Sequence, residues 1–409
     1  MKILYVTTNF SALSHTFITR EIGQLRRLGC EIDLLALRRI APELQAKIPE
    51  CDVSGCRYVY PTSFISAMVS LFTLLVRKPG TVLNAAKVAV SDPTDKVGTK
   101  AKLLFQLAVA SALVKRTTAG DYDLIHAHFA SPPTSFAMLL SLLTGIPYTF
   151  TGHGADVYRD VSALRPKLLH AAGAVGISEY NLNYYRTLVP NMPPTAIVRC
   201  GINLDLFPYQ ARRDDGGEIR ILTVGRCVPK KGFAVMVDAL SELRRRGVPW
   251  SAAIVGDGPI LDELKGRAET AGISSNLEFT GALSLDQVRE HLNRANIFVM
   301  PSIPAPDGDI DGIPVSLMEA MANGCSVVST AVSGIPELVI EGETGLLVPP
   351  DDPTALADAI GRLIEHKDLR TSLSTAGRRY VEDNFSLASA GTTLLEFFSG
   401  IVQNHRRLV

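Results

Sequence analysis

The sequence predicts an α/β protein of two doubly wound domains, each a parallel sheet with helices on both faces. Short apolar runs alternate with helix patterns almost throughout the 409 residues. Continuous apolar strands separated by helices are typical of parallel sheets that are buried on both faces. A charged stretch, ARRDDGGE at residues 211–218, interrupts this alternation and is the best candidate for a linker. The length suits about two to three domains of ~150 residues each.

The first series of elements begins at the N-terminus. KILYVTT is an apolar run that ends in turn residues, and a helix pattern follows from Ser14 to Leu28, ended by Gly29. Further strands are expected at EIDLLAL, YDLIHAHF, PYTFTGHG, AVGIS and TAIVRCG. The most apolar segment, Ser63 to Val76, is short for a membrane span of ~20 residues. We expect a buried or groove-lining helix there, with an interfacial membrane helix as the alternative.

The second series follows the charged stretch. Strands are expected at IRILTVG, SAAIVGDGP, NLEFTG, NIFVMPS, CSVVST and TGLLVPP, again with helix patterns between them. We therefore expect an N-terminal domain over residues 1–205 and a C-terminal domain over residues 206–380. A helical segment over residues 381–409 is expected to pack back on the N-terminal domain. Ligands of such sheets bind beyond the carboxyl ends of the strands, so two facing domains would form one deep cleft.

The amino-acid composition excludes few classes of protein, but it is informative about binding partners. The chain has 41 basic and 41 acidic residues, and a balanced charge makes nucleic acid an unexpected main partner. Its six cysteines include no paired C-x-x-C motif, which favours reduced thiols in a cytoplasmic protein. MKILYVTTNF lacks an apolar h-region and a cleavage site, so no secretory signal is expected.

Two loops of the second series carry groups suited to an anionic ligand. VGRCVPKKG places Arg226 and Lys231 in one strand-to-helix loop, where a guanidinium fork and a mobile ammonium can hold phosphate oxygens. A solvated basic loop is the alternative. GDGP, with Gly256, follows the next strand, and it fits either a close approach to a ligand or a strand–turn–helix geometry alone.

The stretch DGDIDGIPVSLMEAMANGC, residues 307–325, combines acidic residues with a helix start. Pro314 suits a first turn, so the helix is expected to begin near Gly312 or Ile313. Asp311 then precedes the helix, and Glu319 lies about a turn and a half inside it. Eight helical residues separate their side chains by about 12 Å, too far to share one proton or one metal. They could instead reach opposite ends of one ligand, and a metal site is not expected because no histidine is near.

Histidines follow two strands of the first series. His153 lies between two glycines at the end of PYTFTGHG, where a structural role and a functional one are both open. His126 and His128 share one face of their strand, since side chains alternate along a strand. Packing and ligand contact are both open for this pair. Zinc is not expected, because no third ligand is evident from the sequence.

Taken in order, these loops resemble the retaining glycosyltransferases of family four, which have the GT-B fold and use nucleotide sugars. The resemblance covers essentially the whole chain. It is carried by TGHGAD, GISEY, CGINLDLF, VGRCVPKKG, VGDGP, EFTG, DGIPVSLMEAMANGC, SGIPEL and GETGLLVPPDD. The opening NFSALSHTFITREI is similar to the subgroup that builds bacterial exopolysaccharides, colanic-acid type included. The resemblance implies two Rossmann-like domains facing a central cleft.

The resemblance also implies roles for individual residues. Arg226 and Lys231 would grip the donor diphosphate, Asp311 would contact the donor sugar, Glu319 would hold the ribose, and His153 would lie near the sugar. Val315, Ser316 and Leu317 would lie over the diphosphate. The donor-binding candidates are Glu319, Gly256, Phe279, Thr280, Gly312, Ile313, Val315, Ser316 and Leu317. The acceptor-side candidates are Ser14, His15, His128 and Asp156.

The implied activity is transfer of a hexose from a UDP- or GDP-sugar to a glycan or lipid-linked acceptor, without metal or other cofactor. The implied location is the cytoplasm, at the inner face of the membrane, with peripheral membrane association. One departure is Asp311, which stands where the family has a glutamate. It suggests one alternative, a non-catalytic sugar-nucleotide-binding protein. A nucleotide-sugar epimerase of related two-domain fold is the other alternative. The first βα turn, TTNFSALS, also lacks the double glycine of many relatives.

Overall fold

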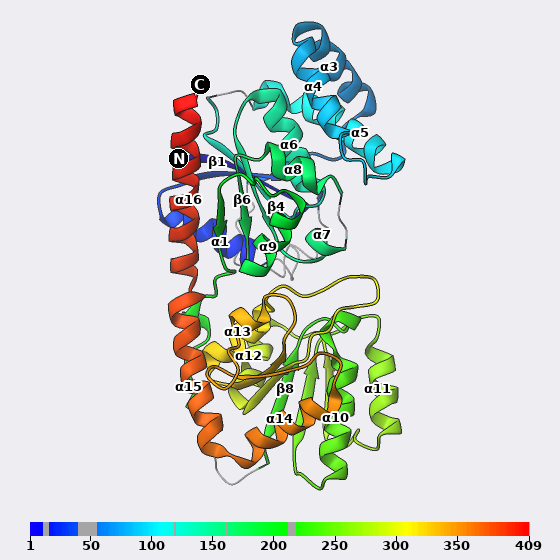
Figure 1. The fold of residues 1–409 in the computed structure, drawn as a ribbon, viewed down its shortest axis with the longest axis vertical. Helices are drawn as coiled ribbons and strands as arrows, with labels where there is room; N and C mark the ends of the chain where they lie inside the picture. The colour runs from blue at the N-terminus through cyan, green and yellow to red at the C-terminus, as the bar shows by residue number, and fades with distance from the viewer. Residues whose placement is uncertain (11–15, 40–54, 118–119, 160–161, 212–217, 409) are drawn as a thin grey trace. The chain divides into compact units, whose positions relative to one another are not determined.

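The computed structural model describes residues 1–10, 16–39, 55–117, 120–159, 162–211 and 218–408. The chain forms two compact units (Figure 1). Unit 1 comprises Met1–Gly201 and Leu387–Val409, and unit 2 comprises Ile202–Ser386. The backbone N–H of Ile202 donates to the carbonyl of Phe385, and Ile202 pairs with Ser386 in an isolated bridge. The chain therefore crosses between the units a few residues from the expected positions 205 and 380, and the first crossing precedes the charged stretch at 211–218.

Unit 1 contains a seven-stranded sheet in the order β3-β2-β1-β4-β5-β6-β7, with every neighbouring pair parallel. All strands expected in the first series are present. The two-residue edge strand β3 was not expected, because two residues carry no apolar run. The strands are β1 (Lys2–Thr7), β2 (Glu31–Ala36), β3 (Arg57–Tyr58), β4 (Leu124–His128), β5 (Tyr148–Gly152), β6 (Gly173–Gly176) and β7 (Thr195–Ile197).

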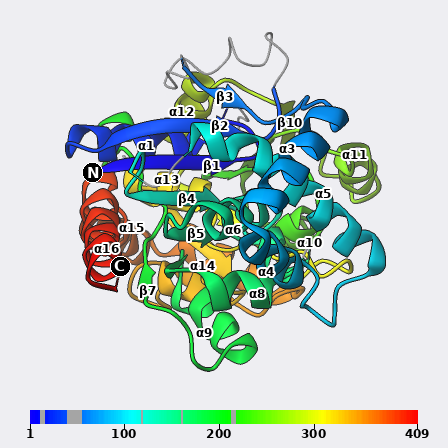
Figure 2. The same ribbon diagram turned by 90° about the horizontal axis from the view of Figure 1, so that it is seen from above.

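Helices cover both faces of this sheet. Alternate residues of β1 enter different cores: Leu4 and Val6 belong to one hydrophobic cluster, Ile3 and Tyr5 to the other. Helices α1 and α16 line the second cluster, on the side of the sheet away from α3, α4 and α5 (Figure 2). The helices of unit 1 are α1 (Thr16–Arg27), α3 (Phe64–Arg77), α4 (Pro79–Ala89), α5 (Val97–Leu113), α6 (Pro132–Thr144), α7 (Ala155–Tyr158), α8 (Leu164–His170), α9 (Glu179–Leu188) and α16 (Leu387–Leu408), with the 3-10 turn η2 (Val114–Arg116).

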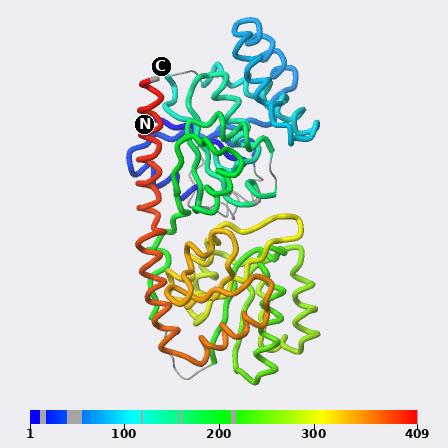
Figure 3. The backbone as a smooth tube through the Cα atoms, in the orientation of Figure 1, coloured from blue at the N-terminus to red at the C-terminus, as the bar shows by residue number. Residues whose placement is uncertain are grey.

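The last helix, α16, completes unit 1. Its side chains Leu394, Phe398, Ile401 and Val402 are buried in the cluster that contains Ile3 and residues of α1. Both ends of the chain therefore lie in unit 1 (Figure 3). Gly391 of α16 lies very close to α1. A Cβ at this position would be only 2.4 Å from Cγ of Gln24, so the close approach of the two helices requires a residue without a side chain.

The most apolar helix, α3, is not buried, so the expectation of a buried or groove-lining helix is wrong. Ala67 is its one fully buried residue, while Ile65 is 73% exposed. The reason is its position: α3 packs on α4 and α5, which separate it from the sheet (Figure 1). Among the described helices, residues 97–116 are long and apolar enough to cross a membrane. Leu103 and Leu107 of that stretch are buried in unit 1, as in a core helix of a globular domain.

Unit 2 contains a six-stranded parallel sheet in the order β10-β9-β8-β11-β12-β13, and all six expected strands are present. They are β8 (Arg220–Val224), β9 (Ser251–Val255), β10 (Leu277–Gly281), β11 (Ile297–Met300), β12 (Ser326–Thr330) and β13 (Leu346–Val348). The helices are α10 (Phe233–Arg245), α11 (Leu261–Thr270), α12 (Leu285–Arg294), α13 (Val315–Asn323), α14 (Pro353–Glu365) and α15 (Lys367–Asn384), with the 3-10 turns η3 (Leu204–Leu206), η4 (Pro229–Lys231) and η5 (Ile335–Glu337).

The strand order reverses direction between β8 and β11 in unit 2, and between β1 and β4 in unit 1. In doubly wound sheets ligands bind at this reversal, beyond the carboxyl ends of the strands. The loops after β8 and β11, and the segments after β1 and β4, are therefore where functional side chains are to be sought.

Candidate functional site

The loops after β8 and β11 touch in unit 2. Gly232, at the N-terminus of α10, has a positive φ of 64°, and a Cβ there would lie 1.8 Å from the carbonyl oxygen of Pro301. Only glycine fits this close approach. The contact brings Lys231, the residue before it, beside the loop that carries Asp311.

Asp311 is the centre of a buried charge cluster. Its carboxylate lies 2.9 Å from Nζ of Lys231 and 3.5 Å from Nζ of Lys230, and it accepts a 2.8 Å hydrogen bond from Oγ of Ser302. Burial alone would raise the pKa of this carboxyl, but the two lysines and the Ser302 bond outweigh it and lower the pKa. Asp311 is therefore an anion at neutral pH. Lys230 also pairs with Asp309 at 3.0 Å.

The sequence predicted that Lys231 and Asp311 contact different parts of a ligand. It did not predict that the two side chains pair with each other. It also missed Lys230 and Ser302, which complete the cluster. A lysine next to Lys231 was visible, but nothing in the sequence indicated which of the two would face the loop after β11. The pairing follows from the order of the strands, which makes β8 and β11 neighbours.

The loops after β8, β9 and β10 form a continuous edge beside this cluster. Gly256 has a φ of 147°, and a Cβ there would lie 1.8 Å from the carbonyl oxygen of Gly225. Its N–H donates to the carbonyl of Gly281 at 2.9 Å. Arg226 is exposed in the first of these loops, and Phe279 and Thr280 are half-buried at the end of β10. These candidates thus lie along one carboxyl edge of the sheet.

Helix α13 begins at Val315, later than the expected start near Gly312 or Ile313. Pro314 is its N-cap, with an extended ψ of 124°, so it precedes the helix and is not part of its first turn. Val315 and Ser316 are half-buried.

Two donor-binding candidates next to this helix start face the protein interior. Leu317 is fully buried, its N–H donates to the carbonyl of Pro314 at 3.1 Å, and Ile313 is 6% exposed. The side chains of Ile313 and Leu317 therefore pack in unit 2 and do not reach solvent, unlike those of Val315 and Ser316. Gly312 is half-buried, and Glu319 is the fifth residue of α13 and 9% exposed.

Unit 1 joins three polar side chains from three elements. His128, at the end of β4, lies 3.0 Å from His153 through Nδ1 and Nε2, respectively. Nε2 of His128 lies 2.9 Å from Oε1 of Glu21 on α1, and the Tyr5 hydroxyl donates to the same oxygen at 2.7 Å. We call Glu21, His128 and His153 the relay.

The relay couples the protons of the two rings. A carboxylate that is ionised only accepts, and Nε2 of His128 then donates to Glu21. When the His128 ring is neutral as well, its Nδ1 accepts the hydrogen bond and Nε2 of His153 donates it. The His153 ring is half-buried between Phe17 and Phe129, with centroids 4.7 and 5.0 Å away.

Two acceptor-side candidates, His128 and Asp156, are buried and cannot touch a bound acceptor in this structure. Asp156 instead accepts hydrogen bonds from the backbone N–H groups of Ala130 at 2.7 Å, Gly154 at 2.8 Å and His153 at 3.2 Å. Burial raises the pKa of Asp156 despite these bonds. Asp156 thus fixes the loop that holds His153. The other two acceptor-side candidates, Ser14 and His15, lie outside the described residues.

One group within the described part of the chain has the composition of a metal site. Ligand atoms of Glu21, His126 and His128 lie within 4.8 Å of one another, so the third ligand that the sequence did not reveal is Glu21. Hydrogen bonds already engage both histidines: Nδ1 of His126 with Thr149 at 2.9 Å, its Nε2 with Thr151 at 3.2 Å, and His128 as above. The cluster is satisfied as a hydrogen-bond network, which does not fit a resident metal.

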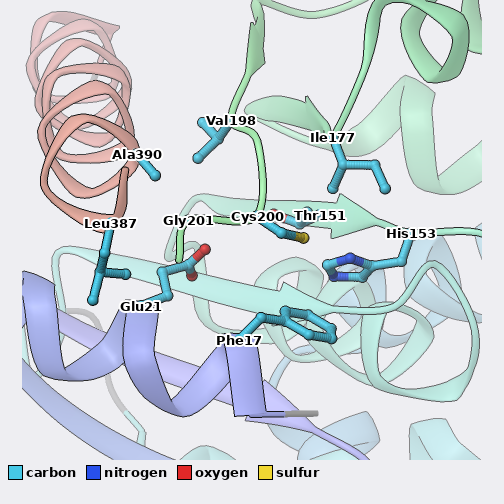
Figure 4. A pocket seen from close by; sticks show the side chains of 10 residues that line it. All are labelled: Phe17, Glu21, Thr151, His153, Ile177, Val198, Cys200, Gly201, Leu387 and Ala390. Carbon is cyan, nitrogen blue, oxygen red and sulfur yellow. The ribbon is translucent and has the colours of Figure 1, made fainter. Parts of the chain in front are cut away.

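A small pocket of unit 1 opens beside the relay (Figure 4). Glu21 and Phe17 reach it from α1, and His153 from the end of β5. Its wall is mostly apolar, with His153 as its basic side chain and Glu21 as its acidic one. The lining residues are Phe17, Glu21, Thr151, His153, Ile177, Val198, Cys200, Gly201, Leu387 and Ala390.

Comparison with known families assigns a model to each half of the chain. Residues 15–206 match the model described as Glycosyltransferase Family 4. Residues 210–380 match the model described as Glycosyl transferases group 1. The two matches together contain the relay residues Glu21, His128 and His153 and the residues of the charge cluster around Asp311.

Two curated relatives match over nearly their whole length. The amylovoran biosynthesis glycosyltransferase AmsK of Erwinia amylovora is 28% identical, with 97% of this chain and 98% of the relative covered. The putative colanic acid biosynthesis glycosyltransferase WcaL of Salmonella typhimurium is 29% identical, with 94% and 96% covered.

Solved structures share the fold. Sucrose-phosphate synthase of Thermosynechococcus elongatus superposes with a TM-score of 0.74 at 19% identity, covering 99% of this chain and 100% of that one. HepE of Anabaena in complex with UDP gives 0.74 at 16% identity, covering 98% and 100%.

Proposed function

Because the chain belongs to the family-four glycosyltransferases, with the GT-B fold of two Rossmann-like domains, we propose that it moves a hexose from a nucleotide-diphosphate sugar to a glycan or lipid-linked acceptor. The anomeric configuration is retained, and neither a metal nor another cofactor takes part. The observation that carries the proposal is the ion pair between Lys231 and Asp311 at the strand reversal of unit 2. It puts a cation and an anion side by side where a charged, hydroxyl-rich ligand is expected.

Unit 2 holds the donor in this proposal. Arg226, Lys231 and the N–H groups at the N-terminus of α13 suit the two phosphates. Asp311 accepts hydrogen bonds from sugar hydroxyls, and Glu319 does so from the ribose. Since Lys231 touches Asp311 before the donor arrives, binding makes this ammonium share its hydrogen bonds between the carboxylate and a phosphate.

The transfer step breaks the bond between the anomeric carbon and the phosphate oxygen. An acceptor oxygen bonds to that carbon on the same face, and its proton passes to the departing phosphate. Lys231 and Arg226 stabilise the charge that develops on the leaving group, and positioning supplies the rest of the catalysis. His153 of unit 1 acts near the donor sugar, and the relay orients its ring through Nε2.

The relatives suggest the biological setting. AmsK and WcaL are named for amylovoran and colanic acid biosynthesis, so we place this chain in the synthesis of an exopolysaccharide. Both uridine and guanosine remain candidates for the nucleoside of the donor. A GDP-mannose-dependent mannosyltransferase of Mycolicibacterium smegmatis is 34% identical over 44% of this chain, while HepE was solved with UDP. The proposed location is the cytoplasm, at the inner face of the membrane.

A thermal-shift screen of UDP, GDP and their sugars tests donor binding, and nucleotide release with and without acceptor tests transfer. We expect one nucleotide to raise the melting temperature, and release to depend on acceptor. Arg226→Ala and Lys231→Ala should each cost about 3–4 kcal/mol of transition-state stabilisation. Arg245→Ala is the matched control, because Arg245 is 72% exposed in the last turn of α10, at the end of that helix away from the loop after β8. Normal turnover in both test variants would refute the phosphate assignment.

A further inference from the structure

The outer face of α3 carries an apolar stripe that no described part of unit 1 covers. Ile65, Met68, Val69, Phe72 and Val76 recur at helical spacing, and each is between 41% and 73% exposed. Phe64, at the start of the helix, is 64% exposed. We call these six residues the α3 face.

The opposite side of the same helix is apolar too. Ala67 is fully buried, and Leu71, Leu74 and Leu75 pack against the larger core of unit 1. A helix that is apolar all round is normally buried on every side. The inner side of α3 is buried in this way and the α3 face is not, so the α3 face is the side that needs a covering partner.

Neighbouring helices extend the apolar surface. The Phe64 ring stacks on Phe105 of α5 at 6.3 Å, and Phe105 is itself 37% exposed. Leu83 of α4 is 61% exposed, and Val97 at the start of α5 is 85% exposed. α3 lies farther from the sheet than α4 and α5 (Figure 1). An exposed apolar area of this extent marks an interaction site in a globular protein.

The charges around this surface are of one sign. Residues 61–117 hold eight basic residues and two acidic ones, in a chain whose charges balance overall. Asp92 is buried, and the Asp95 carboxylate accepts a 3.1 Å hydrogen bond from the N–H of Ala163. The outward charge is therefore positive. The basic residues are Arg77, Lys78, Lys87, Lys96, Lys100, Lys102, Lys115 and Arg116.

We propose that this layer of three helices docks on an anionic lipid bilayer, with α3 lying in the plane of the interface. The α3 face enters the boundary of the acyl chains, and the lysines and arginines contact phosphate-bearing headgroups. The inference rests on the proposed function, in which the acceptor is lipid-linked, and it identifies the surface of unit 1 that meets the membrane.

The same observations argue against other occupants. A symmetric dimer through the α3 face would bring the two sets of basic side chains together, which is unfavourable. Fourteen residues are too few for α3 to cross a bilayer that needs ~20. The stretch at 97–116 is held in unit 1 by its buried side, so it cannot leave to span the membrane without opening the core.

Vesicle flotation of the full chain tests the proposal, with phosphatidylcholine vesicles that contain or lack phosphatidylglycerol. The chain should float with the anionic vesicles, and added salt should weaken binding. Ile65→Ser combined with Phe72→Ser should lower the partition coefficient at least about tenfold. Lys78→Glu with Lys102→Glu should lower it by about fivefold or more for each charge. Leu169→Ser is the control, because Leu169 is 56% exposed on α8, outside these three helices.

Circular dichroism melting should give the same transition for all variants, since every substituted side chain is exposed. Equal binding to neutral vesicles, no binding by the unaltered chain, or unchanged binding of both double variants would overturn the proposal. So would a dimer in sedimentation velocity that the Ile65/Phe72 variant dissolves. Transfer to a water-soluble acceptor should be unchanged in these variants. Failure of that reaction in the unaltered chain would count against the proposed function and leave vesicle binding standing.

Discussion

Nδ1 of His128 lies 3.0 Å from Nε2 of His153, and Glu21 holds the other nitrogen of His128 at 2.9 Å. One hydrogen bond between two imidazoles needs one donor and one acceptor, so the proton of one ring decides the tautomer of the other. A half-buried carboxylate on α1 is thereby coupled to the tautomer of a histidine that lines the pocket. Glu21 is a positioning residue in this reading, because it acts through His128.

Glu21→Gln is expected to lower turnover about 10- to 100-fold, the size seen when the partner that orients a functional histidine is removed. A glutamine can donate or accept, so it no longer selects one tautomer. The KM for the donor should change little, because unit 2 holds the nucleotide. Steady-state kinetics separate kcat from KM. Tyr5→Phe is the control, since it removes a bond to Glu21 and leaves the relay intact.

A double-mutant cycle with His153→Ala sharpens this test. If Glu21 acts through His153, then Glu21→Gln should have almost no further effect on turnover once His153 is alanine. Additive losses in the double variant would mean that Glu21 acts by another route, such as the stability of unit 1.

Replacing Glu319 and replacing Asp311, the two carboxylates of the donor site in unit 2, should have different effects on binding and turnover. Glu319→Ala should weaken the bare nucleotide diphosphate as well as the donor, because the ribose is common to both. Asp311→Ala should leave the affinity of the bare nucleotide nearly unchanged and lower turnover of the donor. Calorimetry with the nucleotide alone, beside turnover with the donor, checks both expectations. Equal loss of nucleotide affinity in the two variants would contradict the assignment of Asp311 to the sugar.

Asp311→Glu restores the longer side chain of the family and should be tolerated or change the choice of donor. Because Asp311 is 6% exposed and contacts Lys231, Lys230 and Ser302, the longer carboxylate must displace one of these partners. We therefore expect a small loss of melting temperature beside retained turnover. Loss of turnover equal to that of Asp311→Ala would show that the aspartate itself is required.

Chelation should leave activity unchanged. The nitrogens of His126 and His128 are engaged by Thr149, Thr151, Glu21 and His153, and Asp309 and Asp311 pair with lysines. Turnover measured after EDTA treatment and desalting checks this expectation. Recovery of a lost activity by zinc would point to Glu21, His126 and His128, whereas recovery by Mg²⁺ or Mn²⁺ would point to the acidic loop of unit 2.

A buried lysine gives a pH dependence of stability. Lys167 of α8 is fully buried, donates to the carbonyls of Ala130 and Ser162 at 2.6 Å each, and has its pKa lowered by burial from 10.5 to about 7. Between pH 7 and 10.5 the unfolded chain holds a proton that the folded chain lacks. The free energy of unfolding should therefore rise with pH across this window, by at most ~1.4 kcal/mol per pH unit from this group.

Lys167→Met removes this titration. Denaturant unfolding of both proteins between pH 7 and 9.5 should show a difference in unfolding free energy that grows with pH in favour of the unaltered chain. The other ionisable groups cancel in this difference. Two parallel curves would mean that Lys167 stays charged in the folded state, held by its carbonyl acceptors.

The fold could be predicted from the sequence because strands buried on both faces are continuous apolar runs, as at ILYV in β1 and IFVM in β11. Elements without such an apolar run were harder to predict from the sequence. β3 has two residues, and its pairing with β2 is set by tertiary structure. The start of α13 was misplaced because proline suits both the N-cap and the first turn, and the ψ of Pro314 decides between them.

The site was predictable in its residue types but not in its pairings. Arg226, Lys231, Asp311 and His153 stand after strands, where function is expected. Glu21 lies within a helix pattern 107 residues from His128, and no periodicity indicates that the two meet. The exposure of α3 was missed for a related reason. An apolar helix on another helix has the same composition as one on a sheet.

The path of the chain through the two units has a consequence for biosynthesis. Unit 2 is one continuous segment, so it can fold as soon as residues 202–386 have been translated. Unit 1 starts first but is completed later than unit 2, because Leu394, Phe398 and Ile401 of α16 fill its core only after α16 has been translated. Until then the α1 side of its sheet exposes Ile18, Ile22 and Leu25 to solvent. The residues of α1 that are translated first are thus exposed to chaperones for the longest time. A stop codon just before α16 would leave a folded unit 2 attached to an incomplete unit 1.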